Sequence, residues 1–498
     1  MQVYANPVLP GFYPDPSVCR VGDDYYLVTS SFEWFPGVPI FHSRDLVHWR
    51  QLGHVLDRPG QLDLTGLGAS RGIFAPTLRH HDGVFYMVTT VVDGGGNFIV
   101  TARDPAGPWS DPVWVPEALG IDPSLLFDEG RVWLHGTRER REQAHDGDTE
   151  VWLLELDPRT LRPVGDERII WDGSLKKAFW PEGPHIYRIG DRYYLLSAEG
   201  GTDWHHSIVI ARSSSVTGPY EGYRGNPVLT HRHFGRAHPI TGTGHADLIQ
   251  TQHGEWWAVL LAMRPYGGYH YNLGRETFLT RVRWEDGWPL FDQVAAEAPA
   301  PGLPAHPWPA EPGRDDFDAT ELALCWNHLR TPHETYWSLT ERPGHLRLRP
   351  RPETFAGNPS MLARRQRHQN FTARLAMEFR PEGDACAGLA VVQNDTHHYL
   401  LMLTADGLVL RDAHRVLAKA DVPPGVVHLG VQARGQDYRM SYATGNGEWR
   451  PIGDTLDGRI LSSTVAGGFT GAYVGMYAGG DGGAPADFDW FDYQGEGE

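Results

Sequence analysis

Apolar and polar residues alternate in short runs along most of the chain. Runs of four to eight residues, rich in aromatic and aliphatic side chains and bounded by Gly, Pro, Asp and Asn, recur from Tyr4 to Phe291. Alternation with a period of two is typical of β-strands, because successive side chains point to opposite faces of a sheet. No segment has sustained helical periodicity. The pattern therefore predicts an all-β fold.

Five segments of this region resemble one another. Each has a short apolar run, a polar turn and then an aromatic or aliphatic strand, and the five align on Tyr25, Phe85, Val132, Tyr193 and Trp256. The aligned residues are 60, 47, 61 and 63 positions apart, and a second shared unit follows each copy, such as IFHSRDLVHW after the first. Repeats of this kind predict a propeller of five four-stranded blades. The alternative is an irregular sandwich, whose strands would resemble one another without being repeats.

A proline-rich stretch separates this region from the rest. Six prolines fall within the fourteen residues from Pro299 to Pro312, and proline favours extended backbone and cannot continue the interior of a sheet. We therefore place a five-bladed β-propeller at residues 1–298, a linker at 299–313 and a second domain at 314–498. The short strand patterns of the second domain predict a β-sandwich of concanavalin or jelly-roll type. We expect its closing ADFDWFDY segment to pair near Asp315, because domain termini often lie close together.

The composition of the chain limits the binding partners and the cellular compartment that we expect for it. Acidic residues outnumber basic ones by 62 to 44, which gives a formal net charge of −18 and disfavours nucleic acid and anionic membrane surfaces as partners. The N-terminal segment has no basic start and no apolar core, and no run reaches membrane-spanning length, so we expect a cytoplasmic protein. The three cysteines, Cys19, Cys325 and Cys386, have no metal or redox spacing. We expect them to be reduced thiols.

Three carboxylic acids occupy the same position in the aligned repeats. In the first, third and fourth repeats the position is Asp15, Asp122 and Glu182, ten or eleven residues before the aligned strand residue. In the second repeat it falls on Ala75, and in the fifth on His245 or the alanine after it. If the repeats surround an axis, equivalent positions converge on one point. Three converging acids predict either a metal site or a hydrolytic site.

The identities of the acids favour hydrolysis. Asp15 and Asp122 both begin an Asp-Pro-Ser triplet, in which proline stiffens the backbone that aims the carboxylate, whereas Glu182 has one more methylene of reach. An inverting glycosidase needs an acid that protonates the leaving oxygen and a base that activates water, about 6.5–9.5 Å apart. An ionised Asp122 near Glu182 would keep Glu182 protonated, as a general acid must be. A single Asp-Pro is more often a turn cap, but turns do not explain three acids in one register.

Longer motifs carry a resemblance to a known family. The chain resembles the glycoside hydrolase family 43 β-xylosidases over nearly its whole length, through NPVLPGFYPDPSV, TSSFEWFPGVPIFHSRDLVHW, GIDPSLLFD, WPEGPHIY and LGRETF. The resemblance implies an inverting mechanism in which Asp15 is the general base, Glu182 the general acid and Asp122 the residue that orients Glu182 and modulates its pKa. It also implies an exo-acting enzyme that releases xylose from the non-reducing ends of β-1,4-xylo-oligosaccharides.

The same resemblance implies the residues of the sugar pocket. Arg275 is expected to reach the sugar hydroxyls near the base, Phe32 and Phe74 to line the pocket, and either Phe469 or Tyr473, from a loop of the sandwich, to stack on the second sugar. From the residues alone, Phe32 and Phe74 would be interpreted as core aromatics and Arg275 as a surface residue.

His245 is expected at the axis, close to the substrate. The resemblance implies that a calcium ion can be held beneath the acids through His245 and water, and we expect no organic cofactor. His231, His233 and His238 precede His245 at spacings that match no zinc motif, so we interpret them as loop histidines.

Two further segments are expected to have structural roles. Residues 68–72, Gly-Ala-Ser-Arg-Gly, match the nucleophile pattern of other hydrolases, but no helical pattern follows them, and we expect them to shape the pocket rim. The charged segment from Arg138 to Glu150 is predicted to be a solvated surface insertion.

Several alternatives stay open at this point. One is α-L-arabinofuranosidase activity, alone or beside xylosidase activity, because the two sugars present similar hydroxyl layouts. Another is a non-catalytic glycan-binding propeller, and a third is a structural calcium site made by the acids. The sequence also leaves a homo-oligomer open.

Overall fold

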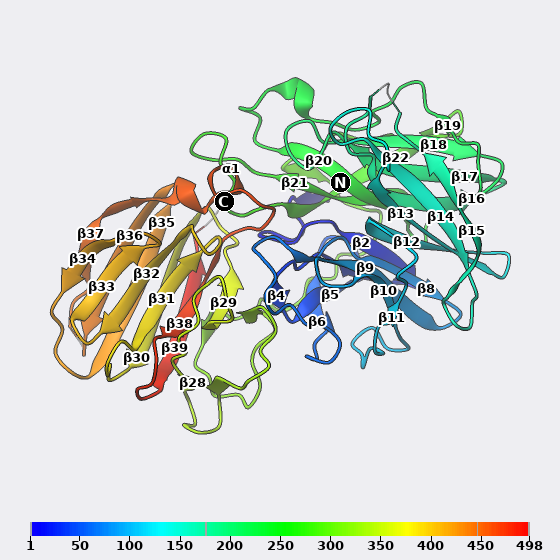
Figure 1. Cartoon of the computed structure of the whole chain (residues 1–498). Coiled ribbons are helices and arrows are strands. Elements are labelled where there is room, and N and C mark those ends of the chain that lie inside the picture. The colour runs from blue at the N-terminus through cyan, green and yellow to red at the C-terminus, as the bar shows by residue number, and fades with distance from the viewer. Residues whose placement is uncertain (1, 175–176, 446, 497–498) are drawn as a thin grey trace.

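The computed structural model describes residues 2–174, 177–445 and 447–496, which form two β-domains packed against each other (Figure 1). Five antiparallel sheets form the blades of the N-terminal domain, and two large antiparallel sheets form the C-terminal domain. The predicted fold class, an all-β chain with a five-bladed β-propeller followed by a β-sandwich, is confirmed.

Each blade is an antiparallel sheet whose strands follow the order of the chain. Blade 1 contains β2 (Ser17–Val21), β3 (Asp24–Val28), β5 (Gly37–Ser43) and β6 (Arg50–Leu56). Blade 2 contains β8 (Thr77–His81), β9 (Val84–Val92), β10 (Gly96–Ala102) and β11 (Val113–Trp114), with β7 (Gly72–Ile73) also paired to β9. Blade 3 contains β12 (Ile121–Asp128), β13 (Arg131–Glu139), β14 (Thr149–Leu156) and β15 (Pro163–Trp171). Blade 4 contains β16 (Glu182–Ile189), β17 (Arg192–Glu199), β18 (Ser207–Ser213) and β19 (Glu221–Gly222). Blade 5 contains β20 (Thr241–Gln250), β21 (Trp256–Met263), β22 (Glu276–Glu285) and β23 (Trp288–Phe291).

The repeats of the sequence correspond to the blades. All five residues on which the repeats were aligned lie at or near the start of the second strand of a blade. In blades 2 and 3 the first two strands are joined by Asp82–Gly83 and Glu129–Gly130, with φ values of 49°, 75°, 49° and 76°. Two successive positive φ values are typical of type I′ turns, whose twist matches that of antiparallel strands. In these two repeats the polar turn therefore sets the register of the strands that follow it.

The predicted linker lies against the propeller. The short strands β1 (Val3–Ala5) and β24 (Glu297–Pro299) pair with each other and bring the two ends of the propeller together. Beyond β24, the backbone N–H of His306 donates to Asp45 at 2.7 Å, and the indole N–H of Trp308 donates to the carbonyl of His48 at 3.2 Å. The linker thus lies along the outside of blade 1 at His306 and Trp308, and it contacts blade 5 where the N–H of Gly302 donates to Glu255 at 2.8 Å.

Two eight-stranded sheets form the sandwich. One contains β27 (Trp337–Ser338), β28 (Leu346–Leu348), β39 (Ala486–Gly495), β30 (Asn370–Glu378), β35 (Val426–Arg434), β36 (Asp437–Thr444) and β37 (Arg450–Asp457), with β25 (Arg314–Asp315) paired to β39. The other contains β34 (Val416–Ala420), β33 (Gly407–Asp412), β32 (His398–Thr404), β31 (Cys386–Val392), β38 (Tyr473–Gly479), β29 (Ser360–Arg365), β26 (Asn327–Leu329) and β4 (Trp34–Phe35). The pairing of β25 with β39 confirms the predicted return of the chain end. Leucines such as Leu375, Leu389 and Leu429 are fully buried between the two sheets.

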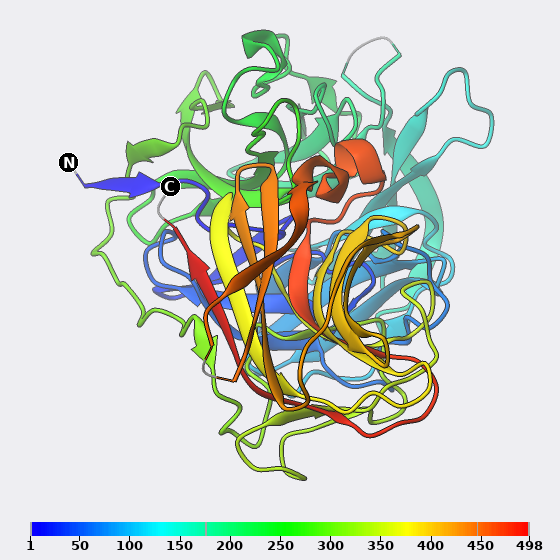
Figure 2. The same cartoon turned by 90° about the vertical axis from the view of Figure 1, so that its left-hand side faces the viewer.

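The two domains share a sheet. Figure 2 looks onto the sandwich with the propeller behind it. Strand β4 leaves blade 1 and completes a sandwich sheet, because Trp34 and Phe35 pair with Leu329 and His328 of β26. The Trp34 ring also stacks on Tyr473 of β38, with ring centroids 3.6 Å apart. The sandwich is therefore fixed beside one end of the propeller.

Helical structure is limited to three short elements in the part of the chain that the structure describes, η1 (Arg232–Phe234), η2 (Gly458–Leu461) and α1 (Ser463–Ala466). None of them is long and apolar enough to cross a membrane.

Candidate active site

The five equivalent positions of the repeats meet in one cavity. This cavity has a volume of about 350 Å³, and its wall includes Asp15, Ala75, Asp122, Glu182 and His245. The residue from the fifth repeat is His245, whereas the alanine after it belongs to an apolar cluster. The equivalent positions of the five repeats thus converge in the structure, as the sequence predicts.

Backbone irregularities aim these side chains. Asp15, Asp122 and His245 have φ values of 53°, 55° and 49°, in the left-handed region that residues other than glycine rarely adopt. The strand register also shifts next to Asp122, Glu182 and His245, in β12, β16 and β20. Bulges and positive φ values of this kind cluster at functional sites, where they redirect a side chain out of the regular pleat.

Asp15 has the environment of an ionised carboxylate. Its side chain accepts hydrogen bonds from the Ser30 hydroxyl at 2.6 Å and from Arg275 at 2.9 Å, and His245 Nδ1 lies 3.8 Å away. Burial alone would raise the pKa of Asp15, but the charge of Arg275, and then that of His245, outweighs it and holds the pKa below its ordinary value. Asp15 is therefore ready to accept a proton.

Glu182 has the opposite environment. Burial, and then the negative charges of Asp122 and Asp15, raise its pKa well above the ordinary value. His206 Nε2 lies 3.9 Å from Glu182 Oε1, but burial lowers the pKa of His206 to about 3, so this neutral imidazole does not favour the ionised form of Glu182. Glu182 is therefore held protonated.

Asp122 orients the segment that carries the acid. Its Oδ2 accepts a hydrogen bond of 2.9 Å from the backbone N–H of Gly183, the residue after Glu182. Burial and the nearby charge of Asp15 raise the pKa of Asp122, although His245 opposes this shift. Asp122 thus affects Glu182 both through its charge and through the backbone.

Three aromatic rings and one guanidinium also form part of the wall. The rings of Phe32, Phe74 and Phe469 lie 5.0–6.1 Å apart between centroids. Arg275 is only 6 % exposed, lies 5.4 Å above the Phe32 ring and donates to Thr202 Oγ1 at 3.0 Å. The expected pocket residues Arg275, Phe32 and Phe74 therefore all lie in the cavity wall.

The structure decides between the two aromatic candidates from the sandwich. Phe469 lines the cavity, whereas Tyr473 is fully buried in its stack with Trp34 and does not line it; the expectation for Tyr473 is corrected. The backbone N–H of Phe469 donates to the Ser70 hydroxyl at 2.8 Å. Gly468 has a φ of 75°, and a Cβ there would overlap Ser70. Ser70, the serine of the apparent nucleophile motif, thus docks the sandwich loop on the pocket rim.

The prediction of a solvated insertion at residues 138–150 is wrong for the end of that segment. The carbonyl of Gly147 accepts a hydrogen bond of 2.8 Å from the N–H of Trp180, and the hydroxyl of Thr149 donates to the carbonyl of Pro181 at 2.8 Å. The hairpin between β13 and β14 therefore packs on the two residues that precede Glu182. Such contacts join residues about thirty positions apart, and charge composition does not reveal them.

A polar network joins all five blades one layer below the acids. Arg79 Nη1 donates to Asp247 Oδ2 at 2.8 Å, and Arg79 Nη2 donates to His185 Nδ1 at 3.0 Å. Ser17 donates to Asp247 at 2.6 Å, and Ser124 lies 3.0 Å from His185 Nδ1. Each of these residues comes from the inner strand of a different blade.

This network does not fit a calcium ion beneath the acids. Calcium takes six to eight oxygen ligands, but the Asp247 carboxylate is already engaged by Arg79. Within residues 2–174, 177–445 and 447–496, no group of three or more His, Cys, Asp or Glu side chains is arranged to hold a metal, and this includes His231, His233, His238 and His245. A positive charge below the site is supplied by Arg79 itself.

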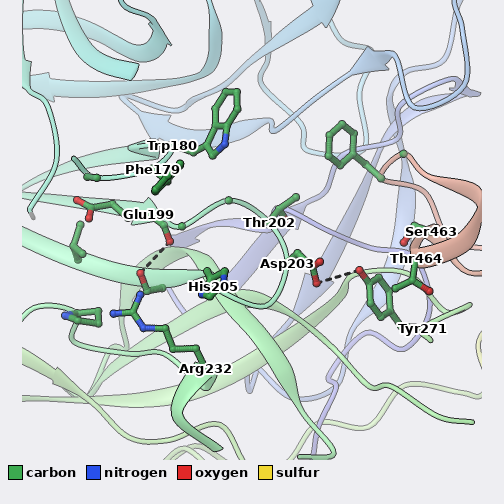
Figure 3. Close-up of a pocket in the computed structure, with 18 of the residues that line it drawn as sticks. Phe179, Trp180, Glu199, Thr202, Asp203, His205, Arg232, Tyr271, Ser463 and Thr464 are labelled. Carbon is green, nitrogen blue, oxygen red and sulfur yellow. Dashed lines mark hydrogen bonds between the residues drawn. The ribbon is translucent and has the colours of Figure 1, made fainter. Parts of the chain in front are cut away.

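A second cavity adjoins the first. It has a volume of about 850 Å³ and shares Trp180, Gly201, Thr202 and Phe469 with the first cavity. Figure 3 shows Trp180 and Thr202 beside residues of this larger cleft, with Ser463 contributed by the sandwich. The small pocket and the wide cleft therefore meet at these four residues.

Sequence reasoning did not single out three residues that lie at or beside the cavity. Trp180 lies in the WPEG motif, which could have indicated it. Thr202 and His206 lie in the loop between β17 and β18, where the repeats share no register. Their position at the site is evident only from the structure.

Comparisons with known proteins agree with this geometry. Residues 4–289 match the family model described as glycosyl hydrolases family 43, and residues 314–494 match the one described as beta xylosidase C-terminal concanavalin A-like domain. A xylosidase/arabinosidase of Butyrivibrio fibrisolvens is 43% identical, covering 97% of each chain. A non-reducing end alpha-L-arabinofuranosidase of Bacteroides ovatus is 44% identical, over 99% of this chain and 95% of the relative. The crystal structure of a xylan beta-1,4-xylosidase from Bacillus halodurans is similar with a TM-score of 0.92 and 38% identity, over 99% of this chain and all of that one.

Proposed function

The chain belongs to glycosyl hydrolase family 43, and we propose that this glycoside hydrolase is an exo-acting, inverting β-xylosidase that releases xylose from the non-reducing ends of β-1,4-xylo-oligosaccharides. The observation that carries the proposal is the pair of opposite pKa shifts in one cavity. Asp15 is held ionised and Glu182 is held protonated, which is the division of roles that acid–base hydrolysis needs.

The mechanism follows from these two states. Asp15 accepts a proton from a water molecule, and the resulting hydroxide equivalent attacks the anomeric carbon. Glu182 donates its proton to the glycosidic oxygen as the bond to the anomeric carbon breaks, so the leaving saccharide departs as an alcohol. Because water attacks from the face opposite the leaving group, the configuration inverts. Arg275 stays paired with Asp15 and keeps the base ionised until the proton moves.

Exo action is supported by the shape of the site. The catalytic cavity is less than half the volume of the cleft that adjoins it, at about 350 and about 850 Å³. Phe32, Phe74 and Phe469 close the smaller cavity on one side. A single terminal sugar fits the small cavity, and the rest of the saccharide extends into the cleft.

The second candidate activity is that of an α-L-arabinofuranosidase, alone or beside xylosidase activity. It is favoured by the two relatives that are 43% and 44% identical, which are named as a xylosidase/arabinosidase and a non-reducing end alpha-L-arabinofuranosidase. The same acid and base would serve both sugars, so discrimination rests on the fit of the glycone to the wall formed by Phe32 and Phe74.

Hydrolysis of xylobiose by the purified protein tests the proposal, with Glu182→Gln as the control and the anomers followed by proton NMR. Appearance of α-xylose first is the expected result. Appearance of β-xylose first would refute inversion. If only the aryl α-L-arabinofuranoside and not the aryl β-xyloside is cleaved, the second candidate is correct. Binding without turnover of either substrate would instead favour a glycan-binding propeller.

A further inference from the structure

The larger cleft continues well beyond the scissile bond. The residues that it shares with the catalytic cavity, such as Trp180 and Thr202, mark the junction between the two. Phe179, Pro227 and Arg232 line the larger cleft only. In Figure 3, Phe179 and Arg232 lie on the propeller side, and Ser463 and Thr464 of α1 lie at the other end.

The cleft lies on the leaving-group side. Trp180 precedes Glu182 by two residues and forms part of both cavities, so the cleft begins where the general acid meets the glycosidic oxygen. The first unit of the leaving saccharide therefore lies at the junction. The volume of about 850 Å³ leaves room for further units beyond it.

Two side chains of the cleft have the chemistry of a sugar site. Phe179 is 50 % exposed, which is unusual for a large aromatic ring, and such rings stack on the apolar faces of sugars. Its carbonyl accepts a hydrogen bond of 2.7 Å from the N–H of Gly200, which fixes the backbone that presents the ring. Among residues 2–174, 177–445 and 447–496 the guanidinium of Arg232 has no hydrogen-bond or ion-pair partner, and only the backbone N–H of Arg232 donates, to the Thr230 hydroxyl. The guanidinium offers several donors to sugar hydroxyls.

The two acidic side chains of the cleft, Asp203 and Glu199, do not form an ion pair with Arg232. The Asp203 carboxylate accepts hydrogen bonds from the hydroxyls of Tyr269 and Tyr271 at 2.8 and 3.3 Å. Glu199 is only 5 % exposed and accepts a hydrogen bond from the N–H of Ser174. Arg232 lowers the pKa of Glu199 without pairing with it, although burial outweighs this effect and raises that pKa to about 7.

We propose that this cleft binds at least two units of the leaving saccharide, with the unit beyond the first stacked on Phe179 and hydrogen-bonded by Arg232. The inference rests on the proposed function, because it assumes that Glu182 protonates the leaving oxygen. It assigns the enzyme to oligosaccharides of three or more units in preference to disaccharides.

Chain-length dependence of kcat/KM tests this inference. The wild-type protein is expected to cleave xylotriose with a kcat/KM about twofold to tenfold above that for xylobiose, the range given by one aromatic contact. Phe179→Ala and Arg232→Gln should each remove most of this ratio, chiefly through KM, because binding away from the reacting atoms acts on ground state and transition state alike.

Matched controls lie close by in the chain. Phe234 is 42 % exposed but does not line the cleft, and Arg224 is exposed and also outside it. Phe234→Ala and Arg224→Gln should keep the wild-type ratio. If kcat/KM is equal for xylotriose and xylobiose, or if the ratio of the two is unchanged in Phe179→Ala, this inference is wrong and the proposed function still stands. Absence of cleavage of either substrate would overturn the proposed function together with it.

Discussion

Replacing Thr137 and Thr149 by valine should impair protonation of the leaving group more than any other catalytic step. The two hydroxyls donate to one acceptor, the carbonyl of Pro181, at 2.6 and 2.8 Å. Thr137 and Thr149 are 1 % and 3 % exposed, and valine has nearly the same shape. The substitution therefore removes the support of the residue before Glu182 while leaving the packing almost unchanged.

The expected loss of stability follows from the two hydrogen bonds. One neutral hydrogen bond contributes about 0.5–1.5 kcal/mol, and leaving a buried carbonyl without a partner costs about 1–3 kcal/mol. Each single variant keeps one donor on Pro181 and should lose about 1 kcal/mol. The double variant loses both donors and should lose about 2–4 kcal/mol. The two effects should therefore be more than additive, as a double-mutant cycle would reveal.

The expected loss of activity depends on the leaving group. General acid catalysis contributes about 10²- to 10⁴-fold where the leaving oxygen must be protonated. The double variant should therefore lose about tenfold or more in kcat for xylobiose. It should lose no more than about twofold for 2,4-dinitrophenyl β-xyloside, because dinitrophenolate departs without a proton.

Thr280→Val is the matched control. The Thr280 hydroxyl also donates to a backbone carbonyl, that of Asp292, at 2.8 Å, but on β22 of blade 5 and outside the catalytic cavity. It should lower the Tm by a similar amount to one single variant without changing the ratio of the two activities. An equal loss on both substrates in the Thr137 and Thr149 double variant would refute a role in placing the acid, and so would no loss on either.

Three further results are expected. As the pH rises, kcat/KM should first increase, because Asp15 ionises at a pH below the ordinary pKa of an aspartate. It should then decrease, because Glu182 loses its proton at a pH above the ordinary pKa of a glutamate. In Asp122→Asn the falling limb should move to lower pH, since the Asp122 charge raises the pKa of Glu182, and an unmoved limb would contradict that effect. Dialysis against EDTA should leave kcat and Tm unchanged because Arg79 supplies the positive charge below the site; a loss restored by Ca²⁺ would refute this. Phe469→Ala should raise KM for xylobiose about tenfold by opening the pocket wall, and an unchanged KM would exclude contact with substrate.

The repeat pattern was sufficient to predict the propeller and the convergence of its three acids. Asp15, Asp122 and Glu182 occupy the same position in their repeats. Because the repeats are arranged around one axis, residues at equivalent positions lie close together. The same logic placed Ala75 and His245 in the cavity wall, where both are found. This inference needs only the period of the sequence, and it does not depend on the details of packing.

Features that depend on packing between repeats could not be predicted in this way. The choice between Phe469 and Tyr473 is made by the stack of Tyr473 on Trp34, a contact between two domains. Likewise, the contact of Thr149 with Pro181 joins adjacent blades. Neither leaves a periodic signal, because each occurs once in the chain.

The network below the acids explains why the repeats supply both the chemistry and its geometry. Ser17, Ser124, His185 and Asp247 follow the equivalent positions of their repeats by two or three residues, and Arg79 follows its own by four. Because each network residue lies only two to four positions along the chain from the equivalent position of its repeat, a contact that fixes the blades in this layer also restricts the separation of the acids in the layer above. A buried pair such as Arg79 with Asp247, at 2.8 Å, contributes little net stability, since desolvation offsets its attraction. Its effect is on geometry: apolar residues between the blades would allow them to slide, whereas directional hydrogen bonds from five strands permit one arrangement of the acids.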